Sequence, residues 1–211
     1  MFKDFENAND THCKVPNVFP SISASIGNYE PQTTIWKTAI YLHSPLRFFL
    51  LYLRWKYYRK VVKDDLGSVV NLAVFLNVIE NLALLGLTHW TSSANYPMHE
   101  KCFKTFIGTS VGYMLITCVI LTKYRRRPVI TNREKQSIKL KWRAFIVNVT
   151  SFAFAAYFFL RHNSHCEPYV YSMFGFAEYI VVISNILFHF TTAYDLQLDS
   201  VYISQYGITI E

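Results

Sequence analysis

The sequence predicts an all-α membrane protein, a polytopic helical bundle with five transmembrane helices. Apolar residues make up 52% of its 211 residues, and charged residues only 17%, against about 25% in ordinary soluble domains. The charges also gather in a few short segments, which leaves long apolar stretches between them. A soluble all-helical bundle is the alternative class, and it is disfavoured because five stretches approach the length that crosses a bilayer.

The first expected element is a polar loop over residues 1–34. It contains the stretch THCKVPNVFPSISASIG (11–27), whose prolines, glycine and small polar residues favour an ordered loop or a short re-entrant segment over a helix. The chain opens on the polar MFKDFENANDTHCK and not on a basic segment followed by an apolar one. We therefore expect no signal peptide.

Five apolar stretches follow the loop, each near the roughly 20 residues that cross a bilayer. They run over 35–55, 67–88, 103–122, 143–160 and 169–193. Short polar joints separate them. The expected organisation is therefore a transmembrane bundle over 35–195, followed by a tail over 196–211.

The basic residues predict the orientation of the bundle. Most of the 21 Lys and Arg residues lie in the joints at 54–63 and 123–143, and the positive-inside rule places such joints in the cytosol. The loop 1–34, the joint 89–101 and the turn RHNSHCEP (161–168) then face the lumen, and the tail is cytosolic. This topology explains the net charge of +7, so no nucleic-acid partner is expected.

Polar side chains recur within the first two stretches, although ionisable groups in hydrocarbon are costly and usually face the interior of a bundle or a wet cavity. In the first stretch, YLHSPLRFF places His43 and Arg47 four residues apart on one helical face. In the second, NLAVFLNVIENLALL places Asn77, Glu80 and Asn81 on one face. Both stretches therefore present a polar face to the interior.

The depth of these residues can be compared at about 1.5 Å of rise per helical residue. On that count His43 and Glu80 lie about 12 Å below the lumenal end of their helices, and Glu178 of the fifth stretch lies about 14 Å below its own. Ser151 of the fourth stretch falls at a comparable depth. His189 shares a face with Glu178, but its depth places it near the cytosolic end, where we expect it to anchor or pack the last helix.

One layer in the lumenal half is therefore expected to collect polar residues from several helices. Its members are His43, Glu80, Asn81, Ser151 and Glu178. The functional interpretation is a pocket for a lipid head group, with His43 or Glu80 carrying a proton. The structural alternative is a buried network in which His43 or Arg47 pairs with Glu80 or Glu178. The residues alone leave both open.

The lumenal segments carry cysteines and histidines. Cys13, Cys102 and Cys166 share the lumenal side, where oxidising conditions allow a pair such as Cys13–Cys166. His162, His165 and Cys166 match no compact metal motif, so a solvated turn is favoured over a zinc site. The glycine-rich phosphate loop, the nucleophile elbow and HExxH are absent. We therefore expect neither a metal nor a cofactor.

Several of these stretches together resemble a known family. The motifs are THCKVPNVFPSISASIG, WKTAIYLHSPLRF, LNVIENLALLGLTHWTSS, MHEKCF, RHNSHCE and FAEYIVVISNILFHFTTAYD. They resemble the post-GPI attachment to proteins factor 2 family, and the N-terminal half of the fungal cell-wall protein Cwh is similar too. The resemblance covers about residues 11–195.

The resemblance implies a multi-pass protein of the Golgi membrane and also of the endoplasmic reticulum. It implies a role in lipid remodelling of glycosylphosphatidylinositol (GPI) anchors, in which a fatty acid is returned to lyso-GPI. GPI-anchored proteins and lyso-GPI are the expected partners. The chain is expected either to be the acyltransferase itself or to be a non-catalytic lipid-binding or scaffolding subunit that presents the substrate to a separate acyltransferase. Relatives usually carry one more span before THC, so an upstream span is expected to be missing here.

If the protein is an acyltransferase, His43 or Glu80 is expected to accept the hydroxyl proton of the lyso-lipid. Arg47 and Arg161 are expected to hold phosphate or phosphoinositol. The remaining expected substrate-binding residues are Asn81, Ser151, His162 and Glu178. Two features depart from the family pattern: His165 stands where relatives have an aromatic residue, and the proline of HSPLRF is shifted by one position.

Overall fold

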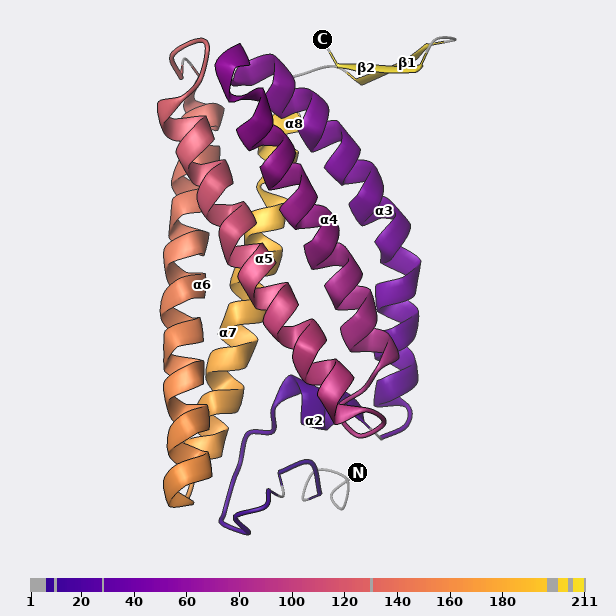
Figure 1. The fold of residues 1–211 in the computed structure, drawn as a ribbon, viewed down its shortest axis with the longest axis vertical. Helices are drawn as coiled ribbons and strands as arrows, with labels where there is room; N and C mark the ends of the chain where they lie inside the picture. Colours follow the sequence, from indigo (N-terminus) through magenta and orange to yellow (C-terminus); the bar gives the residue numbers. More distant parts are fainter. Residues whose placement is uncertain are drawn as a thin grey trace.

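Five long helices run from end to end of the molecule in the computed structural model (Figure 1). The structure describes residues 7–9, 11–27, 29–129, 131–196, 201–204 and 207–210. Within them the long helices are α3 (Gln32–Val61), α4 (Gly67–His89), α5 (Tyr96–Lys123), α6 (Asn132–His165) and α7 (Val170–Phe190). Helices α3 to α6 each contain one of the predicted stretches in full. Helix α7 contains all but a few end residues of the fifth stretch.

Short elements complete the fold, namely α2 (Ile22–Gly27), η1 (Asp64–Leu66), α8 (Thr192–Leu196), β1 (Val201–Ser204) and β2 (Gly207–Ile210). The strands β1 and β2 pair antiparallel. Helix α2 corrects the expectation of a loop without helix over 11–27. It forms because Ser21 caps its first turn, where the side-chain Oγ accepts a hydrogen bond from the Ala24 N–H at 3.1 Å.

The structure confirms the predicted helical membrane bundle. Among the described residues, four segments are long and apolar enough to cross a membrane, namely Asp64–His89, Tyr96–Lys123, Asn132–His165 and Val170–Leu196. Helix α3, the first of the five expected spans, is also long enough, with 30 residues. It is less apolar because it carries cations such as Lys37, Arg47 and Arg54. Arg54 is only 5% exposed, so this charge is turned into the bundle.

The helices pack as two antiparallel pairs with one added helix. Helix α6 runs along α7 and α5 along α4, while α3 lies against α4 (Figure 1). The main apolar core includes Tyr58, Val70, Tyr113, Met114 and Phe188. At one end α6 and α7 extend beyond α4 and α5, and the N-terminal segment with α2 fills that offset (Figure 1).

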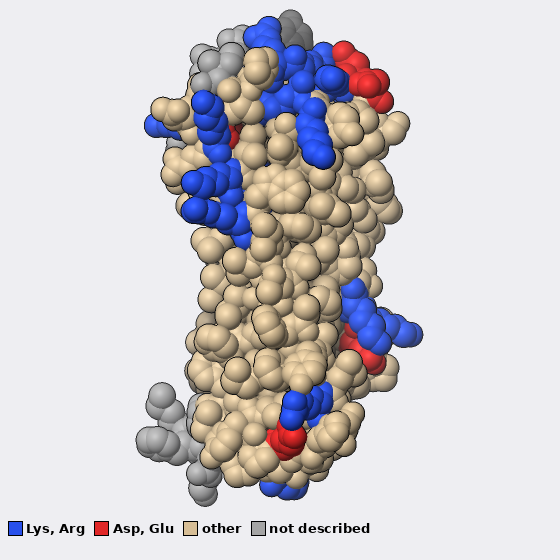
Figure 2. Space-filling view, turned by 90° about the vertical axis from the view of Figure 1, so that its left-hand side faces the viewer, with Lys and Arg blue, Asp and Glu red and all other residues tan. Residues whose placement is uncertain are grey.

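The two ends of the bundle differ in charge. Figure 2 shows Lys and Arg gathered at one end, with a wide belt of uncharged residues below them. We call this the basic end. It contains the joints 62–66 and 124–131, where Arg126 pairs with Asp64 and Arg125 with Glu134. The opposite end carries Cys13 and Cys166, which form a disulfide, and we call it the disulfide end.

A close contact joins the N-terminal segment to α7. A Cβ atom placed on Gly175 would lie 2.9 Å from the Phe19 carbonyl oxygen and 3.0 Å from that of Pro20. Both neighbours are backbone atoms, which cannot rotate away as a side chain can. The absence of a side chain at Gly175 therefore allows the segment to lie directly on α7.

We expect Gly175→Ala to lower the free energy of unfolding by about 1–3 kcal/mol, the usual cost of overpacking a tight contact. The measurement is the thermal midpoint of the purified protein in detergent. Gly108→Ala is the matched control, since a Cβ there meets nothing within 4 Å, and it should leave the midpoint unchanged or raise it. Equal midpoints for the two variants would show that the N-terminal segment does not pack tightly on α7.

Candidate functional site

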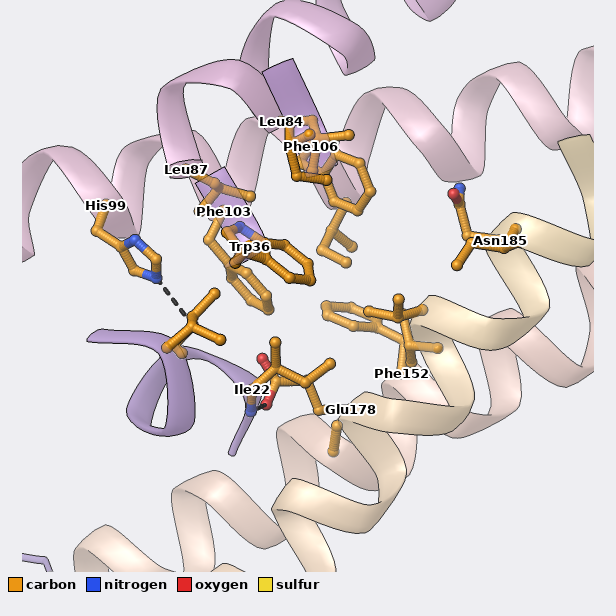
Figure 3. A pocket seen from close by; sticks show the side chains of 18 of the residues that line it. Ile22, Trp36, Leu84, Leu87, His99, Phe103, Phe106, Phe152, Glu178 and Asn185 are labelled. Atoms are coloured by element: carbon orange, nitrogen blue, oxygen red, sulfur yellow. Dashed lines mark hydrogen bonds between the residues drawn. The ribbon is translucent and has the colours of Figure 1, made fainter. Parts of the chain in front are cut away.

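An apolar cavity of about 190 Å³ lies within the half of the bundle nearer the disulfide end. Side chains from α2 through α7 converge on it (Figure 3). Its walls are mainly aromatic and aliphatic, including Trp36, Leu84, Phe103, Phe106 and Phe152. Such a lining suits a hydrocarbon chain, because the hydrophobic effect favours moving the chain out of water and does not require a specific orientation.

A second cavity, which we call the side cavity, also measures about 190 Å³ and lies between α3 and α7. Its lining comprises His43, Arg47, Leu50, Arg54, Asn81, Ile186, His189 and Phe190. Three of these, His43, Arg47 and Ile186, also line the apolar cavity. The two cavities therefore meet at a histidine and an arginine that lie one turn apart on α3.

The hydrogen bonds of His43 and Arg47 define what each can do. The Nδ1 atom of His43 lies 3.2 Å from the Ile40 carbonyl oxygen. A carbonyl only accepts, so Nδ1 carries the proton and Nε2 keeps a lone pair. The Nε–H of Arg47 donates to the Asn81 side-chain oxygen at 2.7 Å. Its two terminal nitrogens have no hydrogen-bond acceptor in the described part of the chain, so they can bind a ligand. A proton acceptor and a cation thus stand together at the junction of the cavities.

Behind this junction lies a fully buried carboxylate, Glu80. Its Oε2 accepts a hydrogen bond from the Asn77 amide at 2.7 Å. Its Oε1 accepts from the Asn185 amide at 2.9 Å and lies 2.9 Å from Nε2 of His189. Since Asn185 lines the apolar cavity and His189 the side cavity, Glu80 holds one wall residue of each.

Arg54 sets the tautomer of His189. Its Nη1 lies 2.9 Å from His189 Nδ1, and an arginine nitrogen can only donate, so Nδ1 is the acceptor and Nε2–H donates to Glu80. The same arginine donates from Nε to the Thr192 hydroxyl at 2.7 Å. The His189 ring also stacks on Tyr113, with 5.5 Å between ring centroids. Both ring nitrogens of His189 are therefore occupied, and it positions its neighbours without a free lone pair.

The structure divides the single polar layer that the depth count predicts. His43 lies on the cavity wall, whereas Glu80 lies in the buried network. Glu178 lines the same apolar cavity as His43, and there it accepts a hydrogen bond from the Ile22 N–H at 2.9 Å (Figure 3). Ser151 is buried on α6, and its neighbour Phe152 lines the cavity instead.

The depth count also ignores that α6 and α7 are offset from α4 and α5 at the disulfide end (Figure 1). The predicted depth of each residue was counted from the end of its own helix. Residues of equal predicted depth therefore lie at different levels when one pair of helices extends further than the other. His189 lies in the last turn of α7, as the depth count predicts, and it packs that end of the helix against Arg54, Glu80 and Tyr113. What the sequence did not predict is that His189 and Arg54 line the side cavity.

The residues expected at the lumenal edge lie away from both cavities. Arg161 donates two hydrogen bonds to Glu167, at 2.6 and 2.9 Å, and this pairing lowers the pKa of the Glu167 carboxyl. His162 is buried, and its Nε2 lies 3.1 Å from the Thr11 hydroxyl. The structure thus gives Arg161 and His162 local partners, and neither lines the cavities described above.

Cys13 and Cys166 tie the N-terminal segment to the end of α6, where Cys166 is the C-cap residue, across 153 residues of sequence. His12, Cys13 and His162 lie close enough to share a metal ion. The Cys13 sulfur is bound in the disulfide, however, so it offers no thiolate, the form that binds zinc. At this cluster the disulfide holds the N-terminal segment to the bundle.

We expect Cys13→Ser to lower the free energy of unfolding by about 2–4 kcal/mol, because the unfolded chain loses its cross-link. The thermal midpoint in detergent, measured with and without reductant, tests this. Cys102→Ser is the control, since Cys102 is a free thiol. Reductant should lower the midpoint of the wild type and of Cys102→Ser, and should not affect Cys13→Ser. An unchanged wild-type midpoint on reduction would contradict the prediction.

Comparisons with known proteins agree over most of the chain. A model of the Frag1/DRAM/Sfk1/Cwh43P N-terminal domain family matches residues 1–198. Post-GPI attachment to proteins factor 2 of Drosophila melanogaster is 44% identical over 192 residues, which are 91% of this chain and 75% of that protein. The protein of that name in Caenorhabditis elegans is 39% identical over 197 residues, 90% and 74% of the two chains.

A relative in Xenopus tropicalis, acyltransferase PGAP2, is 37% identical over 194 residues, 91% of this chain and 77% of its own. No solved structure matches the chain.

Proposed function

Because this chain belongs to the Frag1/DRAM/Sfk1/Cwh43P N-terminal domain family, we propose that it acts in the lipid remodelling of GPI anchors, as the names of its relatives indicate. More specifically, it returns a fatty acyl chain to a lyso-GPI lipid. The observation that carries this proposal is the meeting of the apolar cavity and the side cavity at His43 and Arg47. One place thus offers space for a hydrocarbon chain, a proton acceptor and a cation.

The reaction requires an acyl donor, which is an acyl ester or thioester. The free hydroxyl of the lyso-lipid attacks the donor's carbonyl carbon, and its proton passes to Nε2 of His43. A new carbon–oxygen bond forms, and the donor's carbonyl–oxygen or carbonyl–sulfur bond breaks. His43 then returns the proton to the departing oxygen or sulfur. The histidine ends as it began, and protons and electrons balance.

Two hydrogen-bond donors that line the apolar cavity, Arg47 and Trp36, can bind the oxygen atoms of the reacting lipids. The free nitrogens of Arg47 can stabilise the oxyanion that develops on the carbonyl, or a substrate phosphate. Trp36 lines the apolar cavity, and its indole N–H is buried without an acceptor among the described residues. A buried donor left unpaired is costly. The ester carbonyl of a bound acyl chain would supply the missing acceptor.

The topology fits a lumenal site. The positive-inside rule places the basic end in the cytosol, so the apolar cavity belongs to the opposite, lumenal half of the bundle. GPI-anchored proteins are attached on the lumenal leaflet, and we propose them, with their lyso-GPI lipid, as the partners. We propose the Golgi membrane, and also that of the endoplasmic reticulum, as the location.

The test is transfer by the purified protein itself. The full chain in lipid nanodiscs is given lyso-GPI and an isotope-labelled acyl donor, offered either as a phospholipid or as acyl-coenzyme A. We expect label to appear in the GPI lipid in one of the two reactions. Binding of lyso-GPI with no transfer from either donor would contradict catalysis. It would favour the scaffolding role, with a separate acyltransferase as partner.

A further inference from the structure

A groove of about 310 Å³ lies on the outer side of α6 and α7, toward the basic end. Its lining comprises Leu140, Arg143, Ala144, Val147, Ser184, Leu187, Phe190, Thr191 and Tyr194. It shares one lining residue, Phe190, with the side cavity and none with the apolar cavity. The groove is therefore distinct from the acyl-transfer site, and the inference below does not depend on the proposed function.

The groove exists because small side chains face each other where α6 and α7 approach. Ala144 and Ser184 are buried between the helices, at 9% and 3% exposure. The flanking apolar side chains remain open to the surroundings, with Val147 at 45% and Leu187 at 56% exposure. A hollow with a small-residue floor and exposed apolar walls has the shape and polarity for one hydrocarbon chain.

A cation stands at one end of the groove. Arg143 is exposed, and no acidic side chain lines the hollow beside it. Lys135 and Lys139 precede it at steps of four residues, which places all three cations on one face of α6. The groove therefore ends in a run of positive charge.

The depth of Arg143 matches the level of lipid head groups. It begins the apolar stretch of α6, next to Trp142, and Tyr194 borders the same groove. Tryptophan and tyrosine are enriched where a membrane meets water. An arginine at that level can bind a lipid phosphate while the chain below it lies along the protein.

We propose that this groove binds one anionic glycerophospholipid of the leaflet at the basic end. Its phosphate accepts hydrogen bonds from the Arg143 guanidinium and the Tyr194 hydroxyl, and one acyl chain lies between α6 and α7. Lys139, one turn before Arg143, pairs with the additional negative charge of the head group. A zwitterionic lipid lacks that net charge and binds more weakly.

The test is native mass spectrometry of the purified full chain in detergent, titrated with dioleoyl-phosphatidylserine or dioleoyl-phosphatidylcholine. We expect tighter binding of phosphatidylserine. Arg143→Gln should weaken the binding of both lipids about tenfold, because both carry the phosphate that Arg143 binds and a hydrogen bond to a charged group is lost. Lys63→Gln is the matched control, because Lys63 is an exposed cation of the basic end outside the groove.

A second variant tests the chain-binding part. Leu187→Trp fills the groove at a position already exposed to lipid, so the fold should survive, and both lipids should bind more weakly. Glycerophosphoserine, the head group without chains, should not compete. The proposal is overturned if Arg143→Gln and Lys63→Gln bind phosphatidylserine equally. It is also overturned if Leu187→Trp binds like the wild type, or if glycerophosphoserine competes as well as the lipid.

Discussion

Replacing His43 with alanine is expected to lower the rate of acyl transfer about 10²–10⁴-fold, the usual contribution of a general base. The expectation rests on the Nδ1 hydrogen bond to the Ile40 carbonyl, which directs the lone pair of Nε2 away from the helix backbone. No other hydrogen bond of this ring lies within the described part of the chain. The side chain is exposed, so the fold should keep its stability.

Two measurements test the role of His43. The first is transfer of labelled acyl chain to lyso-GPI by purified protein, and the second is rescue of surface GPI-anchored proteins in cells that lack the activity. His165→Ala is the matched control, because His165 is exposed at the disulfide end and borders neither cavity. Rescue by His43→Ala at the level of the control would remove His43 from the mechanism.

A loss of stability of about 3–5 kcal/mol is expected for Glu80→Gln, the range seen when one partner of a buried ionic network is removed. Each carboxylate oxygen accepts from an asparagine amide, and one also accepts from His189. A glutamine turns one of these oxygens into a donor that faces another donor. The substitution also removes the negative charge of Glu80, which lies near the buried Arg54 guanidinium.

The thermal midpoint of the purified protein in detergent measures this loss. Glu100→Gln is the control, since Glu100 forms an exposed pair with Lys104 at 2.6 Å, and such pairs contribute about 1 kcal/mol or less. Acyl transfer should fall with stability in Glu80→Gln, because Asn185 and His189 lose their anchor. A variant that melts like the wild type yet transfers no acyl chain would assign Glu80 to direct contact with substrate.

Helix positions were predictable because apolar length alone determines which segments can cross a bilayer. The five stretches agree with α3 to α7 to within a few residues at many of their ends. They fall short at the end of α3, the start of α5 and both ends of α6, where polar turns extend the helix beyond the apolar run. The pairing of polar residues between helices was not predictable in the same way. It depends on how far one helix slides along another, and no single-helix pattern records that distance.

The spacing of polar residues in α3 could have predicted the buried position of Arg54. Its position beside a run of cations suggested a cytosolic joint, but its guanidinium lies inside the bundle and contacts His189 and Thr192. It follows Arg47 by seven residues and His43 by eleven, which places the three on one helical face. That shared face was the available signal for Arg54. For His189 the face that it shares with Glu178 was a signal of the same kind, but its pairing with Glu80 depends on how α7 lies along α4.

The disulfide that holds the N-terminal segment affects how the protein matures. Residues of α2 form part of the cavity wall, and the segment before them is bonded to Cys166, far later in the chain. The N-terminal segment therefore waits for the synthesis of most of the bundle before it reaches its final place. Because the closing step is an oxidation, a compartment that keeps thiols reduced cannot complete it. Newly made protein thus completes the wall of its apolar cavity only after insertion is nearly over and its disulfide end has entered an oxidising space.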